Sequence, residues 1–161
     1  MLGEAASGLM RLRQDHGATE GTARYLRPDP RVRAGILLGR NRAATSCIDL
    51  SDGLADGVRQ LAQASSVGIT VDAAAIPVAP QMREWLSAEG IDAVELALRG
   101  GDDFELMFTA RPRQAGRLRA VRRHLGDLPI TRIGTVTRSP RLLVKDSRGQ
   151  RELPEGYQHF R

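Results

Sequence analysis

The sequence predicts one α+β domain in which helices pack on a mixed β-sheet. Two patterns alternate along its 161 residues. In some stretches apolar residues recur every three or four positions, as on one face of a helix, and in others apolar and polar residues alternate, as in a strand. The two kinds of element do not follow strict β-α-β regularity, which favours the α+β class. Apolar residues make up 41% and charged residues 27% of the chain, as is typical of a globular domain.

The N-terminal part predicts two helices joined by a polar segment. Apolar residues recur at helical spacing over residues 5–12, and Gly17 ends this stretch. A polar and irregular segment follows over residues 18–30. The apolar residues within 32–37 then predict a short amphipathic helix.

The centre of the chain predicts a strand and a helix, followed by further elements of both kinds. An apolar run and then a helical pattern place this strand and helix within residues 44–66. β-Branched residues predict a short strand at 69–72. Two helical segments follow within residues 80–98, divided by Gly90, and alternating side chains predict a strand at 104–109.

The C-terminal part predicts one more helix and the last strands. A proline at its start and a periodic apolar stripe predict a helix over residues 112–125. A strand is expected at 130–136. Residues 142–145 are expected to pair with residues 152–153 through a turn at 146–149.

Three polar side chains mark the junction between the strand and the helix of residues 44–66. Asp49, Ser51 and Asp52 end the apolar run, directly before Gly53. A helix N-terminus presents unpaired backbone N–H groups to anions, and carboxylates are ligands that Mg²⁺ prefers. The junction is therefore a candidate site for a phosphate and a metal ion, a combination typical of nucleotide chemistry.

The same residues also fit a purely structural role. Serine and aspartate are common helix N-caps, and such caps are far commoner than metal sites, so Ser51 or Asp52 can simply cap the helix. Asp49 lies too early in the chain to serve that helix. Both interpretations stay open at this point.

A second polar cluster, Gly100-Gly101-Asp102-Asp103, precedes the strand predicted at 104–109. Two glycines allow the backbone to approach a ligand closely, but they are also typical of a tight turn. Both polar clusters lie at strand ends. We therefore expect them to face a common cleft.

The net charge of +5 comes mostly from arginine. The arginines are dispersed along the chain, and the sequence has only one Trp, two Tyr and three Phe, so no nucleic-acid partner is expected. We interpret the run of arginines over residues 113–123 as the solvated face of a helix. A basic surface also suits small phosphorylated substrates.

The single cysteine, Cys47, excludes an intramolecular disulfide, and its apolar neighbours predict a small buried residue. No run approaches the ~18 apolar residues of a membrane span. The N-terminus also lacks the basic, apolar and small-residue pattern of a signal peptide. We therefore expect no membrane partner and a cytoplasmic location.

Three motifs together carry a resemblance to a known family. They are Ile-Asp-Leu-Ser-Asp-Gly-Leu at residues 48–54, Gly-Gly-Asp-Asp-Phe-Glu-Leu at 100–106 and Gly-Tyr-Gln-His-Phe at 156–160. In this order and at this spacing they resemble the thiamine-monophosphate kinases, of the superfamily that includes aminoimidazole ribonucleotide synthetase and selenophosphate synthetase. Residues 3–9 and 26–31 also look like segments of that family.

The resemblance covers essentially the whole chain, but only the C-terminal half of the family's usual subunit. It implies a single domain over residues 1–161 that resembles the C-terminal domain of aminoimidazole ribonucleotide synthetase, with the family's N-terminal ATP-binding domain absent. It also implies ATP- and Mg²⁺-dependent phosphorylation of thiamine phosphate to thiamine diphosphate, incomplete in this chain alone. No general base is assigned, because the acceptor phosphate oxygen is already ionised.

The resemblance assigns roles to five residues, position by position. Asp49 and Asp52 would bind Mg²⁺, and Ser51 would contact ATP. Asp102 stands where the family usually has glutamate, at a position associated with the thiamine phosphate substrate. Tyr157 matches an aromatic substrate-binding position near the C-terminus, where a ring can stack on the cationic heterocycles of thiamine.

Three functions are compatible with these motifs. The first is the kinase domain itself, acting with a separate N-terminal half or a homodimer partner. The second is a non-catalytic domain that binds the ligand or serves as the partner-dependent half of a split enzyme. The third is another ATP-dependent synthetase of the same superfamily, which would show no preference for thiamine phosphate. Phosphoryl transfer to thiamine phosphate distinguishes the first from the other two.

Overall fold

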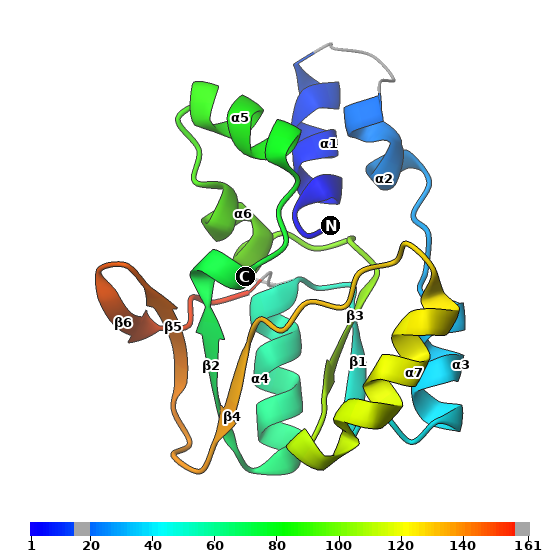
Figure 1. Cartoon of the computed structure of the whole chain (residues 1–161). Helices are drawn as coiled ribbons and strands as arrows, with labels where there is room; N and C mark the ends of the chain where they lie inside the picture. Colours follow the sequence, from blue (N-terminus) through cyan, green and yellow to red (C-terminus); the bar gives the residue numbers. More distant parts are fainter. Residues whose placement is uncertain (15–19, 157–161) are drawn as a thin grey trace.

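The computed structural model describes residues 1–14 and 20–156 and contains the predicted mixture of helices and strands (Figure 1). Its helices are α1 (Glu4–Arg13), α2 (Ala23–Leu26), α3 (Val32–Arg40), α4 (Leu54–Ser65), α5 (Pro80–Ala88), α6 (Ala93–Arg99) and α7 (Ala115–Leu125). Its strands are β1 (Ser46–Leu50), β2 (Gly68–Asp72), β3 (Glu105–Thr109), β4 (Gly134–Thr137), β5 (Leu142–Asp146) and β6 (Gly149–Glu152). Among the described helices, none is long and apolar enough to span a bilayer.

The strands form two sheets instead of one. β1 and β3 make an antiparallel ribbon in which Asp49 lies opposite Leu106. The other sheet has the order β4-β2-β5-β6, with β2 and β5 parallel and the remaining pairs antiparallel. The second sheet is therefore mixed, and the predicted α+β class is confirmed.

The main core is built around α4. Leu54, Val58 and Leu61 recur at helical spacing and are buried, as the sequence predicted. They belong to one apolar cluster with Leu50 of β1 and Val71 of β2. Because β1 and α4 share this core, the short connection between them is held firmly at both ends. Figure 1 shows α1, α2, α5 and α6 gathered at the end of the molecule where α4 begins.

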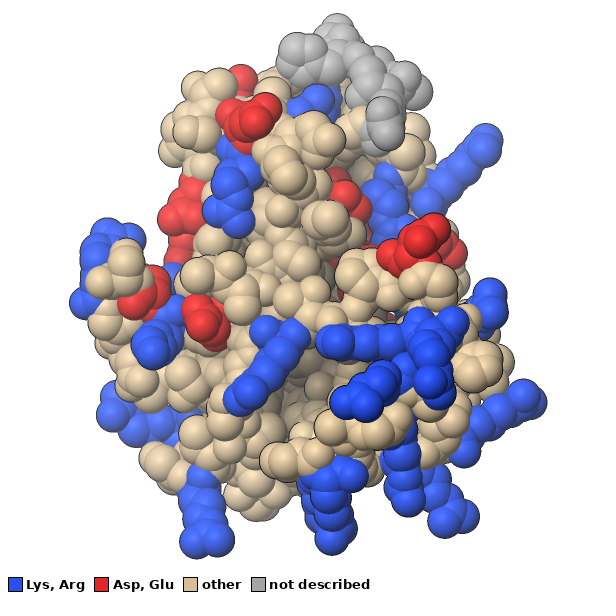
Figure 2. Space-filling view, in the orientation of Figure 1, with Lys and Arg blue, Asp and Glu red and all other residues tan. Residues whose placement is uncertain are grey.

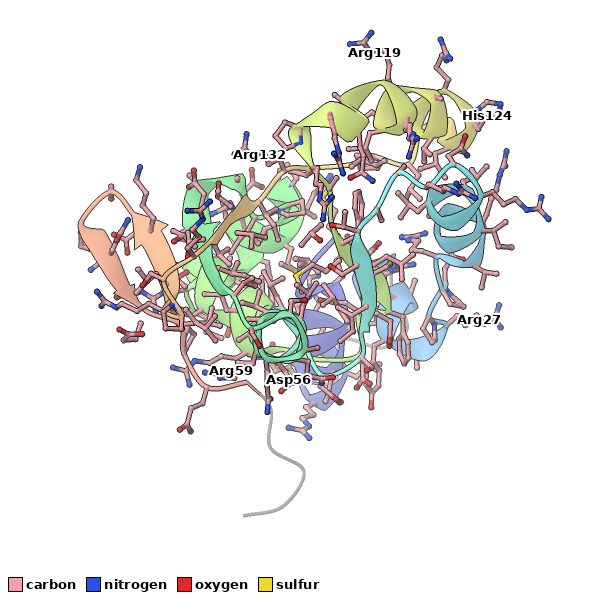
Figure 3. The ribbon with its side chains drawn as sticks, turned by 90° about the horizontal axis from the view of Figure 1, so that it is seen from below. Arg27, Asp56, Arg59, Arg119, His124 and Arg132 are labelled. Atoms are coloured by element: carbon pink, nitrogen blue, oxygen red, sulfur yellow. The ribbon has the colours of Figure 1, made fainter. Side chains whose placement is uncertain are left out.

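A second, smaller core joins α3 to α7. Leu38 of α3, Ala43 and Val121 of α7 are buried together, and Phe108 of β3 packs against them. Figure 3 shows α4 and α7 on opposite sides of the strands. The two helices consequently present separate surfaces to a partner.

Several local predictions are wrong. Part of the segment expected to be irregular over residues 18–30 forms the short helix α2. Cys47 is exposed, because successive residues of a strand point to opposite faces and only the face of Ile48 and Leu50 packs on the main core. The strand expected at 130–136 is shorter, since only the residues from Gly134 onward pair with β2.

Candidate functional site

The first polar cluster forms the connection Ser51-Asp52-Gly53 between β1 and α4, where the sequence placed it. Gly53 takes the N-cap position of α4, with a φ of 95°. A Cβ at this position would lie only 2.5 Å from the carbonyl oxygen of Gly100, so the close approach requires glycine. The N-cap is neither Ser51 nor Asp52, and the capping interpretation of these two residues is therefore wrong.

The second polar cluster lies directly against the first. The backbone N–H of Asp102 donates to the carbonyl oxygen of Ser51 at 2.6 Å. Gly101 makes this contact possible, because a Cβ at its position would lie 2.6 Å from the same oxygen. The two clusters that are about fifty positions apart in the sequence are thus neighbours, as expected from their places at strand ends.

Two residues of the second cluster have unusual backbone conformations. Asp102 has a φ of 65° and Phe104 a φ of 49°, both in the left-handed region. Aspartate tolerates this region, whereas a bulky aromatic residue rarely adopts it. Such strain persists only where neighbouring contacts impose it, and here Phe104 donates its N–H to the carbonyl oxygen of Leu50 at 3.1 Å. The result is an exposed Asp102 beside a buried Asp103.

Asp103, which the sequence did not single out, anchors the start of α1. Its side chain is only 2% exposed, and it accepts hydrogen bonds from the N–H groups of Gly3 at 2.6 Å and Ala5 at 3.1 Å. Burial raises the pKa of Asp103 to about 6, because the two N–H donors offset the loss of water only in part. Nothing in the sequence distinguishes this carboxylate from the adjacent Asp102.

Glu105 ties a third segment to the same loop. Its carboxylate accepts two hydrogen bonds from Arg31, at 2.8 and 2.7 Å, and one from Arg24 at 3.0 Å. Burial acts to raise the pKa of Glu105, but the hydrogen bonds and charge of Arg31, with the N-terminal ammonium and Arg24, outweigh it and hold the pKa below its usual value. Residues 24–31 are thereby fastened beside the second polar cluster.

The two carboxylates expected to bind metal differ in their surroundings. Asp49 is exposed on the face of β1 opposite to Leu50, and Asp52 is half-buried. Within residues 1–14 and 20–156, no group of three His, Cys, Asp or Glu side chains is arranged to hold a metal ion. Mg²⁺ is commonly held by one or two carboxylates, with water and phosphate oxygens completing its shell. The junction of β1 and α4 carries two carboxylates, those of Asp49 and Asp52.

The C-terminal segment crosses the beginning of α4. Arg59 donates to the carbonyl oxygen of Pro154 at 2.6 Å, and a Cβ on Gly156 would lie 3.0 Å from the Cβ of Asp56. Figure 3 shows Asp56 and Arg59 near each other on α4. The last described residue of this segment, Gly156, therefore lies beside the first turn of α4. Tyr157, the aromatic residue expected to bind substrate, lies outside the described residues.

Two hollows lie on the surface of the described part of the chain. A hollow of about 430 Å³ lies between α1 and α5, and another of about 390 Å³ lies beside the second half of α4. Neither of these two hollows is lined by Ser51, Asp52 or Asp102.

A comparison with family models identifies the class of protein. Residues 3–147 match the family described as AIR synthase related protein, C-terminal domain, and the chain belongs to this family. Its curated relatives within the family include thiamine-monophosphate kinases, in agreement with the resemblance drawn from the three motifs.

Individual relatives support this assignment. The thiamine-monophosphate kinase of Escherichia coli strain K12 is 36% identical over 139 residues, which cover 85% of this chain and 41% of the relative. The crystal structure of the Stenotrophomonas maltophilia K279a enzyme has a TM-score of 0.78 and 39% identity, and the match covers 89% of this chain and 47% of that one. A structure described as AaThiL complexed with AMPPCP and TMP has a TM-score of 0.81 and 27% identity, covering 99% and 49%. The chain thus spans about half the length of the relatives that it matches.

Proposed function

We propose that this chain supplies the C-terminal half of an active site that phosphorylates thiamine phosphate to thiamine diphosphate, using ATP and Mg²⁺. The relatives are thiamine-monophosphate kinases, and a related structure contains AMPPCP and TMP. A cytoplasmic location, where ATP is available, is part of this proposal.

One observation carries the proposal. The hydrogen bond between the Asp102 N–H and the Ser51 carbonyl joins the two polar clusters at 2.6 Å. The first cluster has carboxylates and a helix N-terminus, which suit Mg²⁺ and phosphate, while the second presents the exposed carboxylate of Asp102. A phosphate donor on one cluster and an acceptor on the other would lie close together, as direct phosphoryl transfer requires.

Each residue then has a role in binding or orienting the reactants. Asp49 and Asp52 would hold Mg²⁺, which neutralises the charge that repels the two phosphates from each other. Ser51 would contact ATP through its hydroxyl group. Asp102 would attract the cationic part of thiamine phosphate, and Tyr157 would stack on it.

The proposed site needs a second surface. The carboxylate of Asp102 is exposed in the second cluster, and the relatives are about twice as long as this chain. We propose that an N-terminal half, or a second copy of the chain, covers the loops and adds further ligands for the metal and the nucleotide. Excluding water in this way strengthens the electrostatic interactions on which phosphoryl transfer depends.

A chimera tests the proposed reaction. This chain replaces the matching part of the Escherichia coli relative, and formation of thiamine diphosphate is measured with and without ATP and Mg²⁺. We expect product only when both are present, and less than a tenth as much from this chain alone, which corresponds to an activation free energy higher by more than about 1.4 kcal/mol.

The controls separate folding from function. Circular dichroism and a single cooperative unfolding transition establish that the chimera folds. A folded chimera that binds thiamine phosphate without turnover would identify a non-catalytic domain. A folded chimera that phosphorylates a different acceptor would identify another synthetase of the superfamily.

A further inference from the structure

Folding places Arg42 beside the run of arginines that the sequence already groups within residues 113–123. The arginine face is the set of exposed arginines on α7, on the short 3₁₀ helix Pro112–Gln114 before it and on the loop after α3. It comprises Arg42, Arg113, Arg117, Arg119, Arg122 and Arg123. No acidic residue occurs between Glu105 and Asp127 in the sequence. Figure 2 shows the arginines crowded over the half of the molecule that contains α3 and α7, with acidic residues mainly in the other half.

The positive charge of the arginine face is not neutralised within the described part of the chain. Arg117 donates to the carbonyl oxygen of Arg42 at 3.1 Å, and Arg122 donates to that of Ile130 at 2.7 Å. These acceptors are uncharged, so they orient the guanidinium groups without cancelling their charge. The arginines in ion pairs with described carboxylates lie elsewhere, namely Arg24, Arg31, Arg99, Arg141 and Arg151.

Neighbouring like charges repel one another and reduce stability, so such a face is best explained by an anionic partner. Guanidinium groups match phosphate geometry with paired hydrogen bonds. The 11 residues of α7 extend the array over roughly 16 Å, at about 1.5 Å per residue, which is enough to meet several phosphates of one duplex.

The chemistry of α7 favours the phosphate backbone of a duplex over other anionic partners. Residues 111–125 contain no Phe, Tyr or Trp, and the Nδ1 of their one imidazole, His124, lies 2.8 Å from the carbonyl oxygen of Ala120, so they offer single-stranded bases little stacking surface. Leu118, Val121 and Leu125 belong to the second core, which leaves no large apolar side chain on the outer face of α7 to enter a membrane or a protein pocket.

We propose that the arginine face binds the phosphate backbone of double-stranded nucleic acid without sequence preference. The expectation of no nucleic-acid partner rested on the dispersal of the arginines along the chain and on the small number of aromatic residues. The arginine face groups six arginines on one part of the surface, and contact with a duplex backbone needs no stacking residue. Figure 3 shows Arg119 on the side of the molecule opposite to Asp56 and Arg59 of α4. None of the six arginines is a residue of the proposed kinase site.

The test measures fluorescence anisotropy of a labelled DNA duplex titrated with the whole chain at several salt concentrations. The variant Arg113→Glu/Arg119→Glu/Arg123→Glu reverses three charges on the arginine face. The matched control, Arg83→Glu/Lys145→Glu/Arg148→Glu, reverses three exposed charges on α5 and the β5–β6 hairpin. Both variants are first compared with the wild type by circular dichroism and thermal unfolding.

We expect the wild type to bind at about 50 mM salt, with log K falling linearly against log salt. The arginine-face variant should bind at least ~10-fold more weakly, and its salt slope should be smaller by about 2 to 3, because each lost phosphate contact removes about 0.9 from the slope. The control should retain most of the wild-type affinity and its salt slope.

Several results would overturn the proposal. One is the absence of wild-type binding at about 50 mM salt, where electrostatic binding is strong. Another is an equal loss of affinity in the two variants, which would mean that only the net charge matters. Equally effective competition by polyglutamate would point to an acidic protein partner, and tighter binding to phosphatidylserine vesicles would point to a membrane surface.

Discussion

Replacing Asp103 by alanine is expected to lower the free energy of unfolding by about 2 to 3 kcal/mol. The carboxylate is 2% exposed and accepts the N–H groups of Gly3 and Ala5, so its removal leaves two donors at the start of α1 without their acceptor. Chemical denaturation of the chain at neutral pH measures the change. We also expect α1 to separate from the second polar cluster, which hydrogen exchange of the Ala5 amide would detect.

A second aspartate provides the matched control for this variant. Asp92 caps α6 by accepting from the N–H groups of Val94 and Glu95, but it is exposed to solvent. Water can replace this exposed acceptor, so Asp92→Ala should lower the free energy of unfolding by only about 1 kcal/mol. An equal loss in the two variants would contradict the anchoring role of Asp103.

The stability contributed by Asp103 should also depend on pH. Its pKa in the folded chain is about 6, above its usual value of 3.8, because burial disfavours the charged form. The folded state therefore binds the proton more tightly than the unfolded state, and the stability contributed by this group is lost as the pH rises from about 4 through about 6. The asparagine of the variant Asp103→Asn does not titrate. Between those limits we therefore expect the free energy of unfolding of the wild type to fall by about 2 to 3 kcal/mol relative to that of the variant. A difference that stays constant with pH would contradict the assigned pKa.

Replacing Asp49 and Asp52 together by asparagine is expected to reduce the proposed kinase activity of the chimera at least ~100-fold, equivalent to about 2.7 kcal/mol in the barrier. The two carboxylates are the proposed protein ligands of Mg²⁺, and amides carry no charge to hold a divalent ion beside two anionic phosphates. Initial rates of thiamine diphosphate formation, measured over a range of Mg²⁺ concentrations, should show that the variant requires more metal.

The control for this variant lies only one helical turn away. Asp56 is in the first turn of α4 and forms a hydrogen bond with Gln60, and no metal role is proposed for it. The change Asp56→Asn should leave the rate within about threefold, or about 0.7 kcal/mol, of the unsubstituted chimera. A similar loss of rate in Asp56→Asn would contradict the metal role. It would mean that the substitutions act by removing negative charge near α4 and not by removing metal ligands.

The sequence predicted the position of most elements because their apolar patterns match the buried faces in the structure. The stripe of Leu54, Val58 and Leu61 is buried on α4, and the two polar clusters are neighbours. Cys47 was wrongly expected to be buried, because apolar neighbours in the chain do not show which face of a strand meets the core.

Other features of the candidate site depend on contacts between distant segments. Asp103 resembles Asp102 in the sequence, and only the approach of Gly3, one hundred positions away, separates their roles. Gly53 replaces Ser51 and Asp52 as the N-cap because the loop must pass close to Gly100. No local pattern predicts such an approach, since it arises from the packing of two loops.

The central claim is that the two polar clusters form a binding site for thiamine phosphate, and calorimetric titration of the chain with this ligand tests it most directly. The titration is made with and without ATP and Mg²⁺, on the wild type, on Asp102→Asn and on the exposed control Asp127→Asn. Asparagine tolerates the left-handed backbone of Asp102, so the variant removes charge without adding strain. We predict saturable binding to the wild type and to Asp127→Asn, and affinity at least ~10-fold weaker for Asp102→Asn, or about 1.4 kcal/mol. Equal binding by all three chains, or none by the wild type, would contradict the proposed site.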